Sequence, residues 1–355
     1  MRLPRYLSRI LIFLSITCFY LPAAAETKVS GFASMAGGLV TSGDLYLSDF
    51  PNTGIYDEDI SFSPDTTFGV QFKTALHKQS EFIIQIVSHG AREYQTDIDW
   101  AYFNYTIDHE FSVQIGRKRL PLYFYSDFFD LGLAYHWIRP PSDTYTWQIT
   151  NYNGANLYYE SELSNWDMLL NVYIGREDDT DNDLLTYLAS NNSVNETWKN
   201  IIGFVAEFSN ESYELRFTIM SSQLDRQVNN IQIAEDVDQL FYGISANYYY
   251  QALSVLSELN RYERSADDIS VSTYMLSLAY KIKNYTPHVT YSKLEQSKND
   301  IGGDELHNTF SLGLRYDLNK SAALKVQYDS TKDKATNTTI VGDGDLLSFG
   351  IDIVF

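Results

Sequence analysis

The last ten residues of the chain, LLSFGIDIVF (346–355), place apolar side chains at every second position. Because successive side chains of a strand point to opposite faces, this segment predicts a β-strand with one apolar and one more polar face. The same rhythm recurs at 306–318 and 322–329, where Arg315 and Lys325 fall on the polar positions. A slip of one residue in register would turn these cations onto the apolar face, so the alternation fixes the register as well as the strand.

Sixteen alternating segments are found along the chain, and many are close to ten residues long, which suits a tilted membrane-crossing strand. They are predicted at 27–40, 66–76, 81–88, 98–107, 111–117, 152–162, 166–176, 198–208, 213–225, 239–249, 252–263, 271–281, 285–295, 306–317, 322–331 and 346–355. After residue 25 no run of 18 apolar residues exists, so any membrane span must be built from strands. The fold class predicted is therefore all-β, a transmembrane antiparallel β-barrel of about 16 strands.

The connections between these segments alternate between short and long. Seven are tight turns, such as 77–80 and 108–110, and the other eight are longer and mostly polar. The long ones are predicted at 41–65, 89–97, 118–151, 177–197, 226–238, 264–270, 296–305 and 332–345. A soluble β-sandwich would show the same alternation within strands, but it gives no reason for this sorting of loops. Short periplasmic turns and long extracellular loops are typical of bacterial outer-membrane barrels.

Aromatic residues mark one end of the predicted barrel. In five of the seven cases the first apolar-face residue after a tight turn is aromatic. These residues are Phe82, Phe111, Trp166, Tyr213 and Tyr285. Membrane barrels carry aromatic girdles at their interfaces, because such rings have an apolar body and a polar rim. A sandwich core would spread its aromatic residues throughout.

The N-terminus has the features of a removable leader. Arg2, Arg5 and Arg9 form a basic head, residues 10–21 form an apolar stretch, and residues 23–25 are all alanine. This pattern predicts a signal peptide at 1–25 and a single barrel domain at 26–355. A permanent membrane anchor is disfavoured because about 20 apolar residues are needed to span a bilayer.

The composition limits the partners and the stabilising chemistry. The only cysteine lies in the leader, so the predicted mature chain has no disulfide. Without the leader, 23 basic residues face 46 acidic ones, a net charge of −23, which argues against nucleic acid as a partner. A barrel of 16 strands leaves room for an aqueous channel, whereas about 8 strands fill their own interior.

The whole architecture resembles the Gram-negative general porin family. The resemblance rests on the leader, the sixteen strands, the tight turns and an extended insert after the fifth strand. That strand ends in Gly116-Arg117, similar to a glycine–arginine pair found there in the family, and Phe355 resembles the C-terminal signal read by the barrel assembly machinery. The acidic-glycine stretch of enterobacterial porins, Pro-Glu-Phe-Gly-Gly-Asp, is absent.

The resemblance implies a function and a setting. We expect a water-filled channel for passive diffusion of ions and small hydrophilic solutes, in the bacterial outer membrane, surrounded by lipid and lipopolysaccharide. It also implies a homotrimer without cofactors. Two alternatives remain open: a substrate-selective channel, and a closed barrel that serves adhesion or surface structure.

In the family, the loop after the fifth strand folds into the barrel and narrows it, and here this is the aromatic insert 118–151. Selectivity then comes from charges around the constriction. The candidates are Asp127, Asp130, His136 and Arg139 on the loop, Arg117, Lys118 and Arg119 at its start, and Lys73, Arg92, Arg216 and Arg315 on the lumen wall. Arg117 shares the parity of Phe111, which would place it at the outer rim instead.

Other chemistry is not expected. The six histidines lie in no catalytic motif, so no enzyme is predicted. The acidic run at 178–183 lacks the glycine and glutamate that a calcium-binding EF-hand loop places at positions 6 and 12. No metal site is therefore predicted from the sequence.

Overall fold

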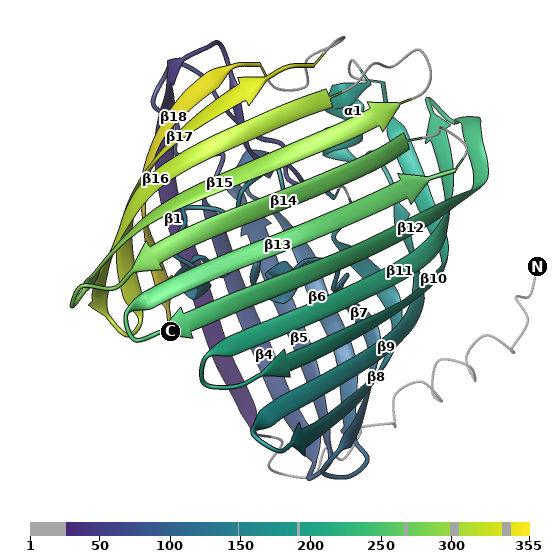
Figure 1. Cartoon of the computed structure of the whole chain (residues 1–355). Coiled ribbons are helices and arrows are strands. Elements are labelled where there is room, and N and C mark those ends of the chain that lie inside the picture. The colour runs from purple at the N-terminus through teal and green to yellow at the C-terminus, as the bar shows by residue number, and fades with distance from the viewer. Residues whose placement is uncertain (1–25, 148, 190–191, 266–268, 299–304, 336–341) are drawn as a thin grey trace, which may run out of the picture.

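The computed structural model describes residues 26–147, 149–189, 192–265, 269–298, 305–335 and 342–355 (Figure 1). In this part of the chain sixteen antiparallel strands form one closed barrel, each paired with its sequence neighbour, and β1 pairs with both β4 and β18 to close it. The barrel strands are β1 (Thr27–Ser42), β4 (Thr67–His77), β5 (Ser80–His89), β6 (Gln95–Thr106), β7 (Phe111–Arg119), β8 (Asn151–Leu163), β9 (Trp166–Asp179), β10 (Val194–Ser209), β11 (Tyr213–Val228), β12 (Ile231–Tyr250), β13 (Leu253–Arg264), β14 (Ile269–Tyr280), β15 (Tyr285–Lys298), β16 (Glu305–Asn319), β17 (Ala322–Asp333) and β18 (Gly344–Val354). The predicted strand count and order are confirmed. The predicted leader lies outside the described residues.

The strands present their apolar side chains to the outside and their polar ones to the inside. Leu312 on β16 and Val326 on β17 are 50% and 43% exposed, whereas Ser311 and Lys325 are 3% and 5% exposed. This is the reverse of a water-soluble protein and matches a barrel whose outer face meets lipid. Among the described residues, helices are all too short or too polar to cross a bilayer.

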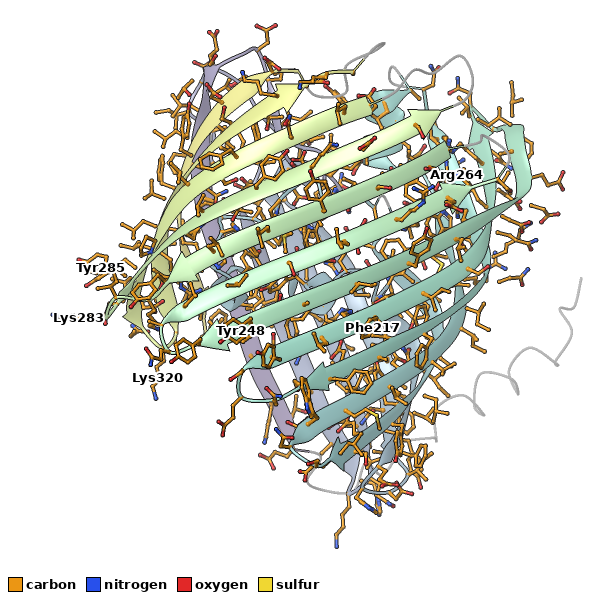
Figure 2. The ribbon with its side chains drawn as sticks, viewed as in Figure 1. Phe217, Tyr248, Arg264, Lys283, Tyr285 and Lys320 are labelled. Carbon is orange, nitrogen blue, oxygen red and sulfur yellow. The ribbon has the colours of Figure 1, made fainter. Side chains whose placement is uncertain are left out.

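The two ends of the barrel differ as expected. At one end tight turns join the strands; in the turn after β6, the backbone amides of Glu110 and Phe111 donate to Asp108, which lowers the pKa of that carboxyl. Aromatic rings pair beside these turns, such as Tyr285 with Tyr316, whose ring centroids lie 4.7 Å apart. Figure 2 shows Tyr285 and Tyr248 at this end of the strands. The predicted aromatic girdle is present.

One predicted long loop is wrong. Residues 226–238 are mostly strand, because β11 continues to Val228 and β12 begins at Ile231. The hairpin turns on Asn229 and Asn230, both with positive φ (50° and 64°), which is the backbone that a two-residue hairpin requires. The strand ends include many polar residues, and the register of the pair shifts at Arg226, so the alternation that revealed the other strands is interrupted there.

Among the described residues, three other connections at the long-loop end contain short elements. The first contains the hairpin of β2 (Tyr46–Asp49) and β3 (Gly54–Tyr56), which the sequence did not predict. Others contain η1 (Gly90–Arg92) and α1 (Asp183–Leu188). The segment after β3 hydrogen-bonds to the upper edge of β1, where Gly38 and Ser61 exchange two backbone bonds of 2.9 and 3.0 Å. That pairing brings Asp65 and Thr67 to the interior.

Candidate functional site

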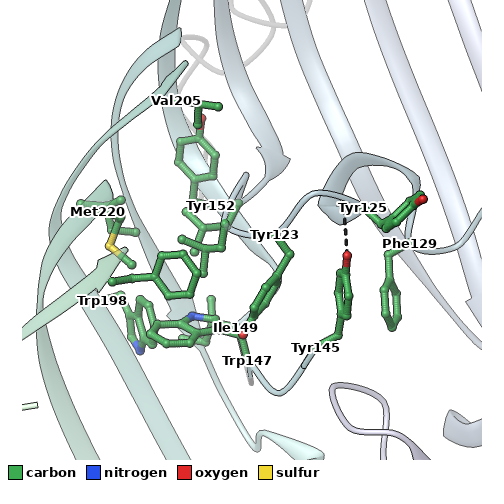
Figure 3. Packing of buried hydrophobic residues seen from close by; sticks show 14 of the residues in the cluster. Tyr123, Tyr125, Phe129, Tyr145, Trp147, Ile149, Tyr152, Trp198, Val205 and Met220 are labelled. Atoms are coloured by element: carbon green, nitrogen blue, oxygen red, sulfur yellow. Dashed lines mark hydrogen bonds between the residues drawn. The ribbon is translucent and has the colours of Figure 1, made fainter. Parts of the chain in front are cut away.

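The described residues of the loop between β7 and β8, 120–147 and 149–150, lie inside the barrel. The loop contains two short 3-10 turns, η2 (Ser126–Phe128) and η3 (Gly132–Ala134). Its aromatic side chains form a buried cluster together with apolar residues of the lumen wall (Figure 3). The loop members are Leu120, Leu122, Tyr123, Tyr125, Phe129, Tyr135, Trp137, Tyr145, Trp147 and Ile149. The aromatic insert of the sequence is therefore the hydrophobic core of the molecule.

One half of the lumen wall is apolar where it meets the loop. Trp147 lies edge-on to Trp198 of β10 and to Phe241 of β12, with ring centroids 5.1 and 5.5 Å apart. The wall members, from β8 to β14, are Tyr152, Tyr173, Trp198, Ile201, Val205, Met220, Leu224, Val237, Phe241, Leu256 and Met275. The sequence signals this half in stretches such as 201–205, where both faces of a strand are apolar.

A buried carboxylate lies within this apolar half. Glu258 of β13 accepts hydrogen bonds from the Tyr145 hydroxyl (2.9 Å) and from the Phe124 amide (3.1 Å). Tyr145 in turn accepts from the Tyr125 amide at 3.2 Å. The carboxylate therefore fixes two separate parts of the loop to one strand.

The opposite half of the wall holds the loop with polar contacts. Lys325 of β17 donates to the carbonyl oxygens of Gly132 (2.6 Å) and Trp137 (2.5 Å) and pairs with Asp352 of β18 at 2.8 Å. Arg315 of β16 donates to two further loop carbonyls, at 2.8 and 2.7 Å. Two wall cations thus stabilise loop backbone groups that would otherwise be buried without partners.

Loop side chains complete this polar half. Trp137 donates from Nε1 to Thr290 of β15 at 2.8 Å, and the Ile138 amide donates to Gln327 of β17 at 3.1 Å. Arg139 donates to the Asp65 carbonyl (3.0 Å) and to the Thr67 hydroxyl. The middle of the loop is therefore bonded to β4, β15 and β17.

A charged cluster surrounds Asp130. This carboxylate contacts His89 of β5 at 2.9 Å, forms an ion pair with Arg119, and lies 3.9 Å from Arg139. Arg119 also lies 3.3 Å from Asp99 of β6. Sequence reasoning proposed Asp130, Arg119 and Arg139 but missed His89 and Asp99, which only the register of β5, β6 and β7 brings to the same place.

The other loop candidates lie apart from one another. Asp127 is exposed, whereas His136 is buried with Nε2 2.9 Å from the Ser277 hydroxyl and its ring against His288. Lys118 is buried, donates to the Tyr158 hydroxyl at 2.9 Å, and lies over the ring of Tyr102. Asp127 is thus the loop candidate that faces open space.

Arg117 is half-buried near the end of β7. It pairs with Glu177 of β9 at 2.6 Å and donates to the Ile98 carbonyl at 2.9 Å. Gly116, just before it, has a φ of 141°, a conformation that favours glycine, and β7 keeps its register with β6 and β8 through this position.

The wall candidates are also engaged by acids. Lys73 pairs with Glu81 at 2.7 Å, and Arg92 pairs with Asp97 (2.5 Å) and Asp183 (2.7 Å). Arg216 forms an ion pair with Glu207 and donates to the Pro121 carbonyl at 2.8 Å, as the loop leaves β7. Like Arg315, it ties the loop to the wall.

Cavities lie on both sides of the loop. One of about 270 Å³ opens toward the long-loop end between β7, β9 and α1, and one of about 510 Å³ lies by Asp127, Phe128 and Phe355. Asp99 and Arg119 border both. A third cavity, of about 610 Å³, lies at the tight-turn end beside β8–β10. The Asp99–Arg119 pair therefore lies between these two cavities.

A closed barrel with an inward-folded loop and cavities on both sides of that loop is the architecture of an outer-membrane channel. Residues 17–336 of the sequence match the Gram-negative porin family. The chain belongs to that family. This porin is therefore an outer-membrane protein of a bacterium, and its family and fold indicate a channel rather than an enzyme. No curated relative matches it.

Solved structures share the fold at low identity. The outer membrane channel DcaP of Acinetobacter baumannii has a TM-score of 0.65 at 11% identity, covering 94% of this chain and 98% of that one. OmpF of Salmonella typhi, solved with daunomycin, has a TM-score of 0.60 at 13% identity, covering 93% and 97%. The trimer form of OmpT from Vibrio cholerae has a TM-score of 0.58 at 10% identity, covering 93% and 99%.

Proposed function

We propose that this porin is a narrow channel for passive diffusion that prefers cations and small hydrophilic solutes without negative charge. The observation that supports this is the charge lining the cavities. The described residues around the 610 Å³ cavity include five carboxylates and no lysine or arginine. These acids are Glu110, Glu160, Glu162, Asp167 and Glu207. Acidic walls concentrate cations and repel anions at the entrance.

The side chains that line the cavity at the long-loop end also carry a net negative charge. Seven carboxylates line it against Arg92, Arg117 and Arg119. The acids are Asp97, Asp99, Glu177, Asp178, Asp179, Asp181 and Asp183. A cation therefore meets excess negative charge on both sides of the loop, and the wall arginines are largely neutralised by acids at ion-pair distance.

The proposed path passes the boundary between the 270 and 510 Å³ cavities. Asp99, Arg119 and Asp130 lie there, and Asp127 faces the larger cavity. Because the loop is fastened to both halves of the wall, we expect this path to stay narrow and single-channel conductance to be small. The predicted constriction role of Asp127, Asp130 and Arg119 is proposed on this ground.

Purified protein in planar bilayers tests the proposal. Under a tenfold KCl gradient we expect discrete conductance steps and a reversal potential of the sign that marks cation preference. Because exposed charges are screened by salt, the preference is expected to weaken as ionic strength rises. A reversal potential of the opposite sign would overturn it. A barrel without conductance steps would support the closed, adhesive alternative, and saturable block by one solute would support a substrate-selective channel.

We also propose that the leader is cleaved, that the protein assembles as a homotrimer, and that Phe355 is read by the barrel assembly machinery. The likeness to a structure described as a trimer supports the second point. For the third, Phe355 is 72% exposed and exchanges backbone bonds of 2.8 and 3.0 Å with Gly31 at the β1–β18 seam. Cross-linking in native membranes should give trimers, and Phe355→Ala should lower the assembled fraction.

A further inference from the structure

A separate group of ligand-type side chains lies on the lumen face near the long-loop end. Glu305 and His307 lie two residues apart on β16, so they share a face, and His307 is paired in register with Asp333 of β17. Their side chains are 6%, 5% and 2% exposed. Nothing in the diffusion function uses these residues.

Their spacing suits a metal ion. His307 Nε2 lies 3.1 Å from Glu305 Oε2 and 3.8 Å from Asp333 Oδ1, and one ligand atom from each residue falls within 4.8 Å of the others. Ligands about 2.0–2.1 Å from a tetrahedral ion are themselves about 3.3 Å apart. The observed distances lie on either side of that value, so small side-chain rotations bring all three atoms to one ion.

One carboxylate oxygen of this group has no partner among the described residues. Asp333 Oδ1 accepts from the Ala335 amide at 2.7 Å, whereas Oδ2 is buried and no described residue hydrogen-bonds to it. A buried carboxylate oxygen without a partner is costly. Within the described part of the chain, no lysine or arginine pairs with Asp333 or Glu305. A protonated His307 would balance only one of these two negative charges.

We propose that Glu305, His307 and Asp333 bind a divalent transition-metal ion such as Zn²⁺. An imidazole beside two carboxylates suits Zn²⁺ and its neighbours, whereas Ca²⁺ and Mg²⁺ prefer six or more oxygen ligands. Three protein ligands leave a fourth position for water.

The site is also next to the inserted loop. Asp143 of the loop accepts a hydrogen bond from Ser292 of β15 at 2.8 Å. Its negative charge acts on His307. A bound cation would therefore join β16 to β17 and strengthen the attachment of Asp143, so that metal stabilises the folded barrel by mass action.

Metal titration of the intact purified barrel, stripped with a chelator, tests the site. Calorimetry with ZnCl₂ should show one saturable site per chain, and Co²⁺ should give the visible absorption of a low-symmetry, four-coordinate ion. Zn²⁺ should also raise the melting temperature. We expect His307→Gln and Asp333→Asn each to weaken Zn²⁺ binding at least tenfold and to abolish the melting shift.

Matched controls separate this site from the acidic surface. His109→Gln removes an exposed histidine at a tight turn, and Glu58→Gln removes an exposed loop acid; neither should change Zn²⁺ binding. Wild-type protein without a saturable site would overturn the proposal, and this needs no substitution to fold. Equal binding by His307→Gln, or binding of Mg²⁺ as tight as Zn²⁺, would overturn it as well.

Discussion

The inserted loop contacts the two halves of the barrel wall by different chemistry. Toward β8–β14 it meets aromatic and aliphatic side chains, with Trp147 packed between Trp198 and Phe241. Toward β15–β18 it meets Lys325 and Arg315, which donate to its backbone carbonyls, and hydroxyl groups such as that of Thr290, which bond to its side chains. The loop thus makes apolar contacts on one side of the lumen and polar contacts on the other.

The difference shows how a loop can be held tightly and also held in a single position. Apolar burial is non-directional and roughly proportional to area, so the aromatic half supplies attachment without fixing a single register. Hydrogen bonds to charged groups are directional, and each leaves a buried group unsatisfied if the loop shifts. We infer that the aromatic half contributes most of the stability and the polar half determines position.

The largest expected loss of stability comes from removing an aromatic contact between the loop and the β8–β14 wall. Trp147 is 3% exposed, and Trp147→Ala should lower the free energy of unfolding by about 3–5 kcal/mol, because it leaves a large cavity. Urea unfolding of the refolded barrel measures this, and single-channel conductance should rise as the loop loosens. Tyr187→Ala, in exposed α1, is the control. Equal losses for both variants would refute the assignment.

Removing a polar contact between the loop and the β15–β18 wall should lower the free energy of unfolding by less. Lys325→Met removes two bonds to loop carbonyls and leaves Asp352 unpaired, and we expect a loss of about 1.5–3 kcal/mol. Adding Asp352→Asn should recover part of it, since no unpaired charge then remains. Lys332→Met, on the same strand but in an exposed ion pair, should cost under about 1 kcal/mol. An equal effect of both lysine variants would contradict the comparison.

The sequence predicted the barrel far better than it predicted the loop contacts. Alternation of period two is a local property, and in segments such as 306–317 it marks both the strand and its lipid face. The hairpin that turns at Asn229 was missed because the ends of its two strands lie where neither face of a strand needs to be apolar. The aromatic insert was correctly placed inside a predicted barrel by its position after the fifth strand.

The partners of the charged loop residues required the closed structure. Asp130 and His89 are 41 residues apart, and Lys325 lies 188 residues from the Trp137 carbonyl that it binds. No local pattern encodes such pairs, because they depend on the register of strands across the lumen. The Glu305-x-His307 spacing is a local signal, but its third member, Asp333, appears only when β16 and β17 are paired.

The hydrogen bond from Trp137 to Thr290 tests whether one side chain belongs to both the aromatic and the polar contacts of the loop. Trp137 packs against Tyr125 with ring centroids 5.6 Å apart, and it also donates to Thr290. Thr290→Val keeps the shape but removes the acceptor, and should cost about 1 kcal/mol in unfolding free energy. Combining it with Trp137→Phe in a double-mutant cycle measures the bond alone. A coupling energy near zero would place Trp137 in the aromatic half only.

The smallest expected effect concerns selectivity rather than stability. Asp127 is exposed to the 510 Å³ cavity, whereas Asp130 is buried among Arg119, His89 and Arg139. One charge about 10 Å from a passing ion in water contributes about 0.4 kcal/mol, so Asp127→Asn should shift the cation-to-anion permeability ratio toward anions roughly twofold. Neutralising Asp127 and Asp130 together should shift it in the same direction.

Asp130→Asn alone separates the two roles. Because Asp130 neutralises buried cations of the wall, its loss should reduce stability and leave the reversal potential closer to wild type than Asp127→Asn does. Reversal potentials under a salt gradient, paired with urea unfolding, give both readouts from the same preparations. If Asp130→Asn shifted selectivity more than Asp127→Asn, the charge facing the diffusing ion would lie in the Asp130 cluster, and that cluster would act on permeation as well as on stability.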